Sequence, residues 1–226
     1  MSNYTCVHCN KSYTKEATLV AHMCEHKRRA LQQNEKRVQA GFMTYNRFYK
    51  LTQAAKKDKT YEEFCKSPYY NAFVKFGSFV NNVNPLYPDK FIDYVIKSGV
   101  KLDHWCRDEL YYTYLAEMIK TEPADAAIQR SLGTMMEWGD ENKAEFAHYF
   151  NYVNVNRAVH HIANGLISPW IVLNCNSGKE LLSKFNDEQL NMIVQIIDPP
   201  YWMKRFKTYP SEIALAKEIC KETGIA

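Results

Sequence analysis

Four side chains near the N-terminus have the types and the spacing of a metal site. Cys6 and Cys9 are separated by two residues, twelve residues follow before His22, and three more precede His26. Thiolates and imidazoles are the ligands that tetrahedral zinc prefers, and four of them close a structural site. We therefore expect Cys6, Cys9, His22 and His26 to hold one Zn²⁺ ion, with no open coordination position for catalysis.

A hairpin and a short helix would position these four ligands. The two cysteines would lie on the turn of the hairpin, and His22 and His26, four residues apart, would share one face of the helix. Cys24 falls on another face of that helix, so we interpret it as a bystander. Such a segment has few apolar residues and would not stay folded without metal. Its expected core consists of Tyr4, Tyr13 and Leu19.

With these ligands and core positions, residues 4–26 resemble the two-cysteine, two-histidine zinc finger family. The resemblance implies a ββα fold and a helix whose residues before the first histidine face DNA, which by spacing are Lys15, Thr18 and Ala21. Lys15 could contact guanine or phosphate, and Thr18 a thymine methyl. One finger covers only about three base pairs, so phosphate contact is expected rather than sequence-specific recognition. A finger that binds protein is the alternative.

Positive charge is concentrated in the first quarter of the chain. Residues 1–59 contain twelve Lys or Arg and four Asp or Glu, whereas residues 60–226 contain seventeen and twenty-one. A basic segment on a mildly acidic remainder is typical of a protein that faces a polyanion. A solvated Lys- and Arg-rich helix would give the same balance. The expected nucleic-acid contacts are Lys15, Thr18, Lys27, Arg28, Arg29, Lys36 and Arg37.

The apolar spacing predicts a mainly α fold with three parts. Residues 1–27 form the ββα finger, and residues 28–59 form a basic amphipathic linker helix that continues the finger helix or restarts directly after it. Residues 60–226 form an all-helical domain. Its helix starts include Tyr87-Pro88-Asp89, a capping box of Ser177 with Glu180, and a break at Asp198-Pro199-Pro200.

Four motifs of common enzyme classes are absent from the sequence. Nucleotide-binding glycine loops, a nucleophile elbow and a zinc-protease motif are all missing. The titratable candidates share no spacing that indicates a shared site, so no catalytic residue is predicted. These candidates are His160-His161, Glu145 with His148, Asp140-Glu141 and Asp103-His104-Trp105-Cys106. Residues 201–207 interleave aromatic and basic side chains, which could stack on bases or could simply form core.

The sequence indicates an intracellular setting. The N-terminus lacks the pattern of a secretory signal, no apolar run could span a membrane, and seven cysteines argue against a disulfide framework. Residues 66–77 and 165–170 are similar to an uncharacterised protein of large tailed bacteriophages. This resemblance implies an early-region accessory protein in the host cytoplasm, and it implies no known reaction.

Three functions remain open from the sequence. The first is a nucleic-acid-binding accessory protein, most simply of DNA, whose finger and basic helix contact phosphates while the helical domain docks a protein partner. The second is an adaptor whose finger binds a protein. The third is an enzyme that processes nucleic acid through carboxylates or histidines of the helical domain. We expect the first of these.

Overall fold

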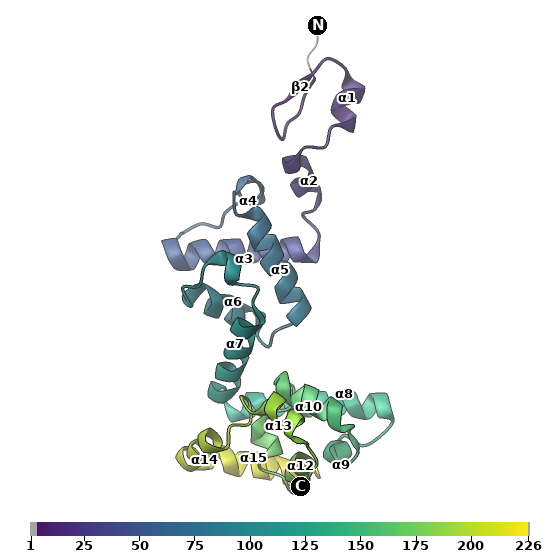
Figure 1. Ribbon diagram of the computed structural model, residues 1–226, viewed down its shortest axis with the longest axis vertical. Coiled ribbons are helices and arrows are strands. Elements are labelled where there is room, and N and C mark those ends of the chain that lie inside the picture. The colour runs from purple at the N-terminus through teal and green to yellow at the C-terminus, as the bar shows by residue number, and fades with distance from the viewer. Residues whose placement is uncertain (1–3, 226) are drawn as a thin grey trace. The chain divides into compact units, whose positions relative to one another are not determined.

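The computed structural model describes residues 4–225, and 70% of it is helical. This part of the chain divides into two compact units, one that ends at Tyr111 and one that begins at Tyr112. Figure 1 follows the chain from an N-terminal hairpin into a succession of helices. The predicted mainly α fold class, with a small sheet at the N-terminus, is confirmed. No described helix is both long enough and apolar enough to cross a membrane.

The first elements are a hairpin and a short helix. Strands β1 (Tyr4–Thr5) and β2 (Ser12–Tyr13) pair antiparallel, and helix α1 (Glu16–Ala21) follows. None of the residues of α1 is buried, and among residues 4–24 only Cys6 is buried, with 4% of its surface exposed. Burial of apolar surface therefore contributes little to the stability of this ββα segment.

The helix expected to carry both histidines is interrupted. Helix α1 ends at Ala21, the backbone of His22 and Cys24 is extended, and α2 (Glu25–Leu31) begins directly afterwards. Cys24 caps α2, because its Sγ accepts a hydrogen bond from the Lys27 amide at 3.4 Å. His22 and His26 therefore do not share one helical face.

The first unit continues with helices that surround a core of aromatic rings. Its elements are α3 (Lys36–Gln53), α4 (Tyr61–Lys66), α5 (Tyr70–Val83), α6 (Pro88–Lys97), the 3-10 helix η1 (Leu102–His104) and the start of α7 (Asp108–Thr121). Helix α3 packs against α5. Two glycines permit this close approach, since a Cβ built on Gly77 would lie 2.2 Å from the Arg37 carbonyl oxygen and 2.6 Å from the Gly41 amide nitrogen.

Residues 28–59 differ from the expected linker helix. The chain leaves the helix after Leu31, and the helical run resumes at Lys36. Val38 and Tyr45 of α3 are buried, so this helix belongs to the core of the first unit. The division between the two compact units lies after Tyr111. Periodicity identified the apolar face of α3 but not its partner, α5.

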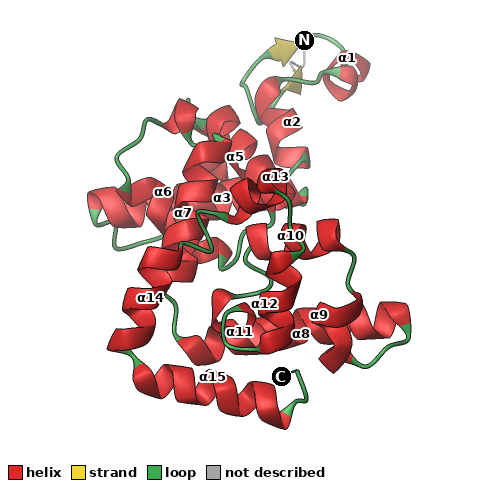
Figure 2. Cartoon of the chain, turned by 60° about the horizontal axis from the view of Figure 1, so that its bottom comes forward, coloured by secondary structure: helices red, strands yellow, loops and turns green. Residues whose placement is uncertain are grey.

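The second unit is built from helices (Figure 2), which range in length from three to nineteen residues. They are α8 (Ala124–Asn142), the 3-10 helix η2 (Phe146–His148), α9 (Tyr149–Tyr152), α10 (Val155–Ala163), α11 (Pro169–Val172), α12 (Asn176–Ser183), α13 (Asp187–Ile193), α14 (Pro199–Thr208) and α15 (Pro210–Glu222). Helix α8 contacts α11 and α15, and α10 contacts α13. Trp138, Trp170 and Trp202 are buried in the interior.

Two of the three predicted helix starts are confirmed and one is wrong. Pro88 is the first residue of α6, and Asp198 caps α14 by accepting from the Tyr201 amide at 3.1 Å. The capping box of Ser177 with Glu180 does not form. Cys175 caps α12 instead, and the Ser177 hydroxyl donates to the Ile225 carbonyl oxygen at 2.7 Å.

Candidate metal centre

Three thiols and one imidazole converge beside the N-terminal hairpin. One ligand atom from each of Cys6, Cys9, His22 and Cys24 lies within 4.8 Å of the other three. The Cys9 Sγ is 3.2 Å from the His22 Nε2. Around a tetrahedral zinc ion, sulfur and nitrogen ligands lie about 3.6–3.8 Å apart. The group is therefore compact enough to hold one metal ion.

The turn of the hairpin brings the first two thiols together. The Cys6 amide donates to the Lys11 carbonyl oxygen at 2.9 Å, and the Asn10 amide donates to the Cys6 carbonyl oxygen at 2.8 Å. Asn10 adopts a φ of 59°, a left-handed conformation that asparagine tolerates better than most residues. The chain between the strands is thereby folded back, with Cys6 and Cys9 on the same side as His22.

Tyr13 orients the imidazole of the group. Its hydroxyl oxygen lies 2.8 Å from the His22 Nδ1, and the two rings are 5.0 Å apart. Burial raises the pKa of Tyr13, and the nearby Cys9 and Cys6 thiols raise it further, so the phenol is neutral. Because the His22 Nδ1 contacts the Tyr13 hydroxyl, the His22 Nε2 is the ring nitrogen that faces Cys9 and could bind a metal ion. Metal-binding histidines commonly have such an outer partner, which the sequence identified only as a core residue.

The thiols of the centre influence one another. A hydrogen bond from the His8 backbone lowers the pKa of Cys6 despite burial of that thiol. At Cys9, a hydrogen bond from the Lys11 backbone lowers the pKa of the thiol. Burial and the neighbouring Cys6 and Cys24 thiols have the larger combined effect, so the pKa of Cys9 is raised. A bound cation would favour the thiolate form at every one of these positions.

The predicted fourth ligand, His26, is not part of this group, and Cys24, which was expected to be a bystander, takes part in it. His26 lies in the first turn of α2, outside the group, and its Nδ1 is buried without a hydrogen-bond partner in the described part of the chain. The earlier expectation assumed one helix through His22 and His26. Because the backbone is extended at Cys24, that thiol turns toward Cys9 instead, and the donor set is Cys₃His, which also suits zinc.

Four of the seven predicted nucleic-acid contacts are exposed and form no ion pair with a described residue. They are Lys15, Thr18, Arg28 and Lys36. Lys27 is half-buried, and its Nζ donates to the carbonyl oxygen of His22 at 3.1 Å. Arg37 is exposed, but its Nε pairs with the Glu35 carboxylate at 2.8 Å.

Arg29 is buried rather than exposed, which corrects its assignment as a phosphate contact. Only 7% of its surface is accessible, and its Nη1 donates to the Cys65 carbonyl oxygen at 2.6 Å. Its guanidinium lies 4.4 Å from the centroid of the Tyr70 ring and pairs with Glu25. Arg29 therefore anchors α2 to α4 and α5.

The titratable candidates of the second unit do not assemble into a reactive site. The His161 Nδ1 lies 2.7 Å from the Tyr149 hydroxyl, and burial lowers the pKa of His161 to about 4. His160 points elsewhere and is exposed beside Asn164. In the part of the chain that the structure describes, no second group of His, Cys, Asp or Glu is close enough to hold a metal ion.

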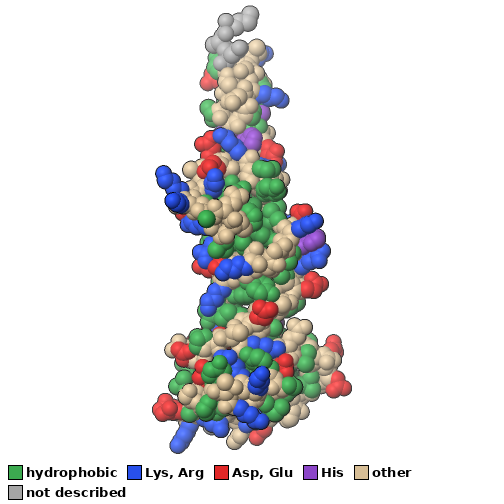
Figure 3. All heavy atoms as spheres, turned by 90° about the vertical axis from the view of Figure 1, so that its left-hand side faces the viewer, with side chains coloured by type: hydrophobic (Ala, Val, Ile, Leu, Met, Phe, Trp, Pro, Cys, Tyr) green, Lys and Arg blue, Asp and Glu red, His purple; other side chains and the backbone are tan. Residues whose placement is uncertain are grey.

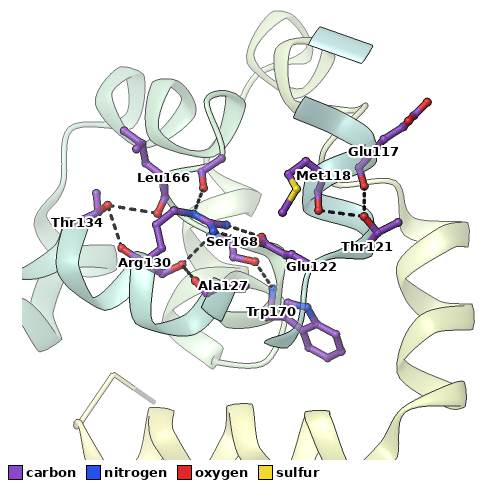
Figure 4. Close-up of polar contacts among 12 residues, drawn as sticks. Glu117, Met118, Thr121, Glu122, Ala127, Arg130, Thr134, Leu166, Ser168 and Trp170 are labelled. Atoms are coloured by element: carbon purple, nitrogen blue, oxygen red, sulfur yellow. Dashed lines mark hydrogen bonds and ion pairs between the residues drawn. The ribbon is translucent and has the colours of Figure 1, made fainter. Parts of the chain in front are cut away.

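Several buried polar groups of the second unit are paired with one another. Figure 4 shows the Arg130 side chain pointing to Glu122. The two form a bidentate ion pair with Nη1 and Oε2 2.6 Å apart, and the Arg130 Nε donates to the Gly165 carbonyl oxygen at 2.7 Å. Ser131 accepts from the Ser168 amide at 2.8 Å. These contacts hold α8 to neighbouring segments of the second unit.

Within the candidate base-stacking segment, residues 201–207, only Trp202 is buried. Trp202 is 1% exposed, and its ring packs 5.6 Å from that of Trp170. Phe206 also packs on Trp170, with ring centroids 5.1 Å apart. The buried Trp202 ring is therefore not available to stack on bases.

Comparisons with protein families, with curated proteins and with solved structures find no match to this chain. The similarity to a bacteriophage protein gains no support from them. The function is therefore argued from the geometry of the chain alone.

Proposed function

We propose that the centre formed by Cys6, Cys9, His22 and Cys24 holds structural Zn²⁺ and that the surrounding segment grips the phosphates of a nucleic acid, with DNA as the first candidate. The soft donor set supports zinc, since thiolates and imidazole exclude hard cations such as Mg²⁺. Four protein ligands leave no open position, so the ion would supply stability and no chemistry.

The observation that carries the proposal is the set of unpaired cations in the first 59 residues. Five of the twelve Lys and Arg residues there form ion pairs, and these involve three of the four acidic residues of the segment. The seven without an ion pair to any described residue are Lys11, Lys15, Lys27, Arg28, Lys36, Lys56 and Lys57. Six of these seven are exposed. Figure 3 shows Lys and Arg side chains interspersed with Asp and Glu on one face. Only the cations without an ion pair to a carboxylate are therefore counted as available to phosphates.

These cations favour binding that is blind to sequence. Lys15 and Thr18 are the exposed finger positions that could reach bases, and Ala21 offers only a methyl group. Most of the free energy of nucleic-acid binding would therefore come from phosphate contacts and the release of counterions. Such binding is steep in salt and similar on all sequences.

The test is binding of the zinc-loaded protein to single- and double-stranded DNA and RNA at two salt concentrations. Changing Lys11, Lys15, Arg28 and Lys36 to Gln should weaken binding on every sequence and flatten its salt dependence, since each lost duplex contact lowers the logarithmic slope by about 0.9. A matched control removes four exposed charges of the second unit. These are Lys184, Lys204, Lys217 and Lys221.

Two results would count against nucleic-acid binding. One is equal affinity of the finger variant and the control variant, and the other is no affinity for any nucleic acid. A Cys9→Ser variant, which removes one metal ligand, should lose the same salt-steep component as the charge variant if the finger presents the cations.

An adaptor is the second candidate, and it is favoured by apolar side chains on the finger. Val7, Val20 and Met23 are 87%, 71% and 57% exposed. Large exposed apolar groups on so small a segment are typical of a protein-docking surface. If the finger is an adaptor, changing these three residues to Ser should abolish capture of a defined partner while leaving metal binding intact.

A protein partner on the second unit is supported by an exposed apolar groove. Tyr112, Leu115 and Met192 help to line a groove of about 450 Å³ between α7, α10 and α13. Met192 is 59% exposed and the adjacent Val194 is 52% exposed. Changing Met192 and Val194 to Ser should weaken such a partner without affecting nucleic-acid affinity.

A further inference from the structure

A groove of about 540 Å³ runs along one face of α3 in the first unit. Gln39, Phe42, Met43, Asn46 and Lys50 line it, and their spacings of three and four residues place them on one face of the helix. Over these residues α3 advances about 16 Å. The groove is large enough for a planar ring and its attached sugar.

Apolar side chains form much of the wall of this groove. The Phe42 ring packs edge to face on Tyr61, with centroids 5.5 Å apart, and both rings line the groove together with Ile92 of α6. Met43 also lines it and is 45% exposed. An aromatic ligand would bury this surface favourably.

The cations that line the groove are already neutralised. The Arg47 Nη2 donates to the Asp93 Oδ2 at 2.6 Å, and the Lys50 Nζ lies 2.6 Å from the Asp58 Oδ1. Asp89 lines the groove as well and adds a carboxylate without an ion pair to any described residue. An anion inside the groove would therefore find no free positive partner, so the occupant should be uncharged.

Free carboxamides complete the lining. Gln33, Asn34 and Gln39 are exposed, and their side chains make no hydrogen bond to another residue that the structure describes. A carboxamide offers a donor and an acceptor side by side, which match the edge of a nucleobase in a two-point contact. An apolar wall, free carboxamides and balanced charge together suit an uncharged heteroaromatic ring.

Unpaired cations lie near both ends of the groove. Lys36 precedes Gln39 by three residues, on the same face of α3, and Lys56 and Lys57 follow the C-terminal end of that helix. These three lysines are exposed. They could hold phosphates on either side of a base that enters the groove.

We propose that this groove receives an unpaired base of a single-stranded nucleic acid. The proposal rests on the proposed nucleic-acid function and adds to it the form of the strand and the element that contacts bases. The base lies against Phe42 and Met43, and its edge meets the carboxamides. Duplex DNA cannot enter, because its bases are already paired and stacked.

The first experiment separates base contacts from phosphate contacts. We would measure, at one salt concentration, the affinity of the zinc-loaded protein for a single-stranded oligonucleotide and for an abasic chain of equal length. The protein should prefer the strand with bases by about tenfold. Gln33→Ala, Asn34→Ala and Gln39→Ala together should remove most of this preference. The matched control is Gln53→Ala, Asn71→Ala and Asn82→Ala, three exposed carboxamides outside the groove.

The second experiment uses nucleosides, which carry no phosphate. Adding adenosine or cytidine should shift the methyl resonance of Met43 and leave those of Met136 and Met203, which are exposed in the second unit, unchanged. A shift of Met43 by short peptides but not by nucleosides would assign the groove to a protein segment and overturn the proposal.

The two experiments distinguish failure of the groove from failure of the proposed function. Equal affinity for strands with and without bases would overturn the groove proposal and leave phosphate binding standing. No affinity for either strand would overturn both. The groove proposal would also be overturned if the groove variant preferred the strand with bases as strongly as the control variant and the unchanged protein do.

Discussion

At the scale of residues, one backbone segment decides which side chains gather at the candidate metal centre. The extended conformation of His22 and Cys24 turns the Cys24 thiol toward Cys9, whereas a continuous helix would have brought His26 there. Tyr13 then sets the orientation of the His22 ring through its hydroxyl. Ligand identity in such a short segment depends on a few dihedral angles.

We predict that Cys24→Ser weakens zinc affinity by at least about 100-fold, because loss of an outer hydrogen-bonding partner alone commonly costs 10- to 100-fold. His26→Ala should leave the affinity nearly unchanged. Competition with a chromophoric chelator measures both, and Tyr13→Phe should give an intermediate loss. A large loss in His26→Ala with little change in Cys24→Ser would restore His26 as the ligand.

We also predict a pH-dependent penalty at His161. Its pKa of about 4 in the folded protein lies below its unfolded value of about 6.5, so protons bind the unfolded chain more readily between these values. The free energy of unfolding should therefore fall by about 1–2 kcal/mol more from pH 7 to pH 5 in the unchanged protein than in His161→Gln. Urea unfolding at both pH values measures this. The exposed neighbour gives the control, since His160→Gln should keep the full pH dependence.

At the scale of elements, the first unit depends on the close contact of α3 with α5. Gly41 and Gly77 bring the two backbones together, and a Cβ on Gly41 would lie 2.7 Å from the Phe73 carbonyl oxygen. This contact buries the apolar face of α3 and leaves its other face to line the groove. The helix is thus a core element and a candidate binding surface at once.

Gly77→Ala should destabilise the first unit by about 2 kcal/mol or more, because the added methyl group meets rigid backbone atoms of α3. Gly133→Ala gives a matched control within α8, where a Cβ would meet no atom within 4 Å. It should stabilise the protein by about 0.5–1 kcal/mol through helix propensity. Equal urea midpoints for the two variants would show that α3 and α5 are not in close contact in solution.

At the scale of the whole molecule, the parts of the chain differ in what holds them together. The ββα segment has one buried residue, whereas both compact units contain buried aromatic cores. Arg29 attaches α2 to the core of the first unit through hydrogen bonds that involve no metal ligand. Stability should therefore be lost in stages when the metal is removed.

We expect a strong chelator to unfold residues 4–24 and to leave the remaining helices folded. Limited proteolysis should then cut within this segment, and circular dichroism should lose only a small part of its helical signal. The urea midpoint of the remaining protein should change little. Cys9→Ser without chelator should behave in the same way. Loss of most of the helical signal on chelation would show instead that the metal supports the entire first unit.

The sequence by itself determined the helical class, the location of the candidate metal centre and three of its four members. Those features depend on local spacing: apolar residues at helical intervals, and Cys6, Cys9 and His22 at distances that a hairpin and helix can bridge. The tertiary structure alone decided that Cys24 joins them, that Arg29 is buried under Tyr70, and that α3 packs on α5. These three outcomes depend on where a helix ends and on which distant segment a helix contacts. The spacing of neighbouring residues encodes neither the end of a helix nor its distant contacts.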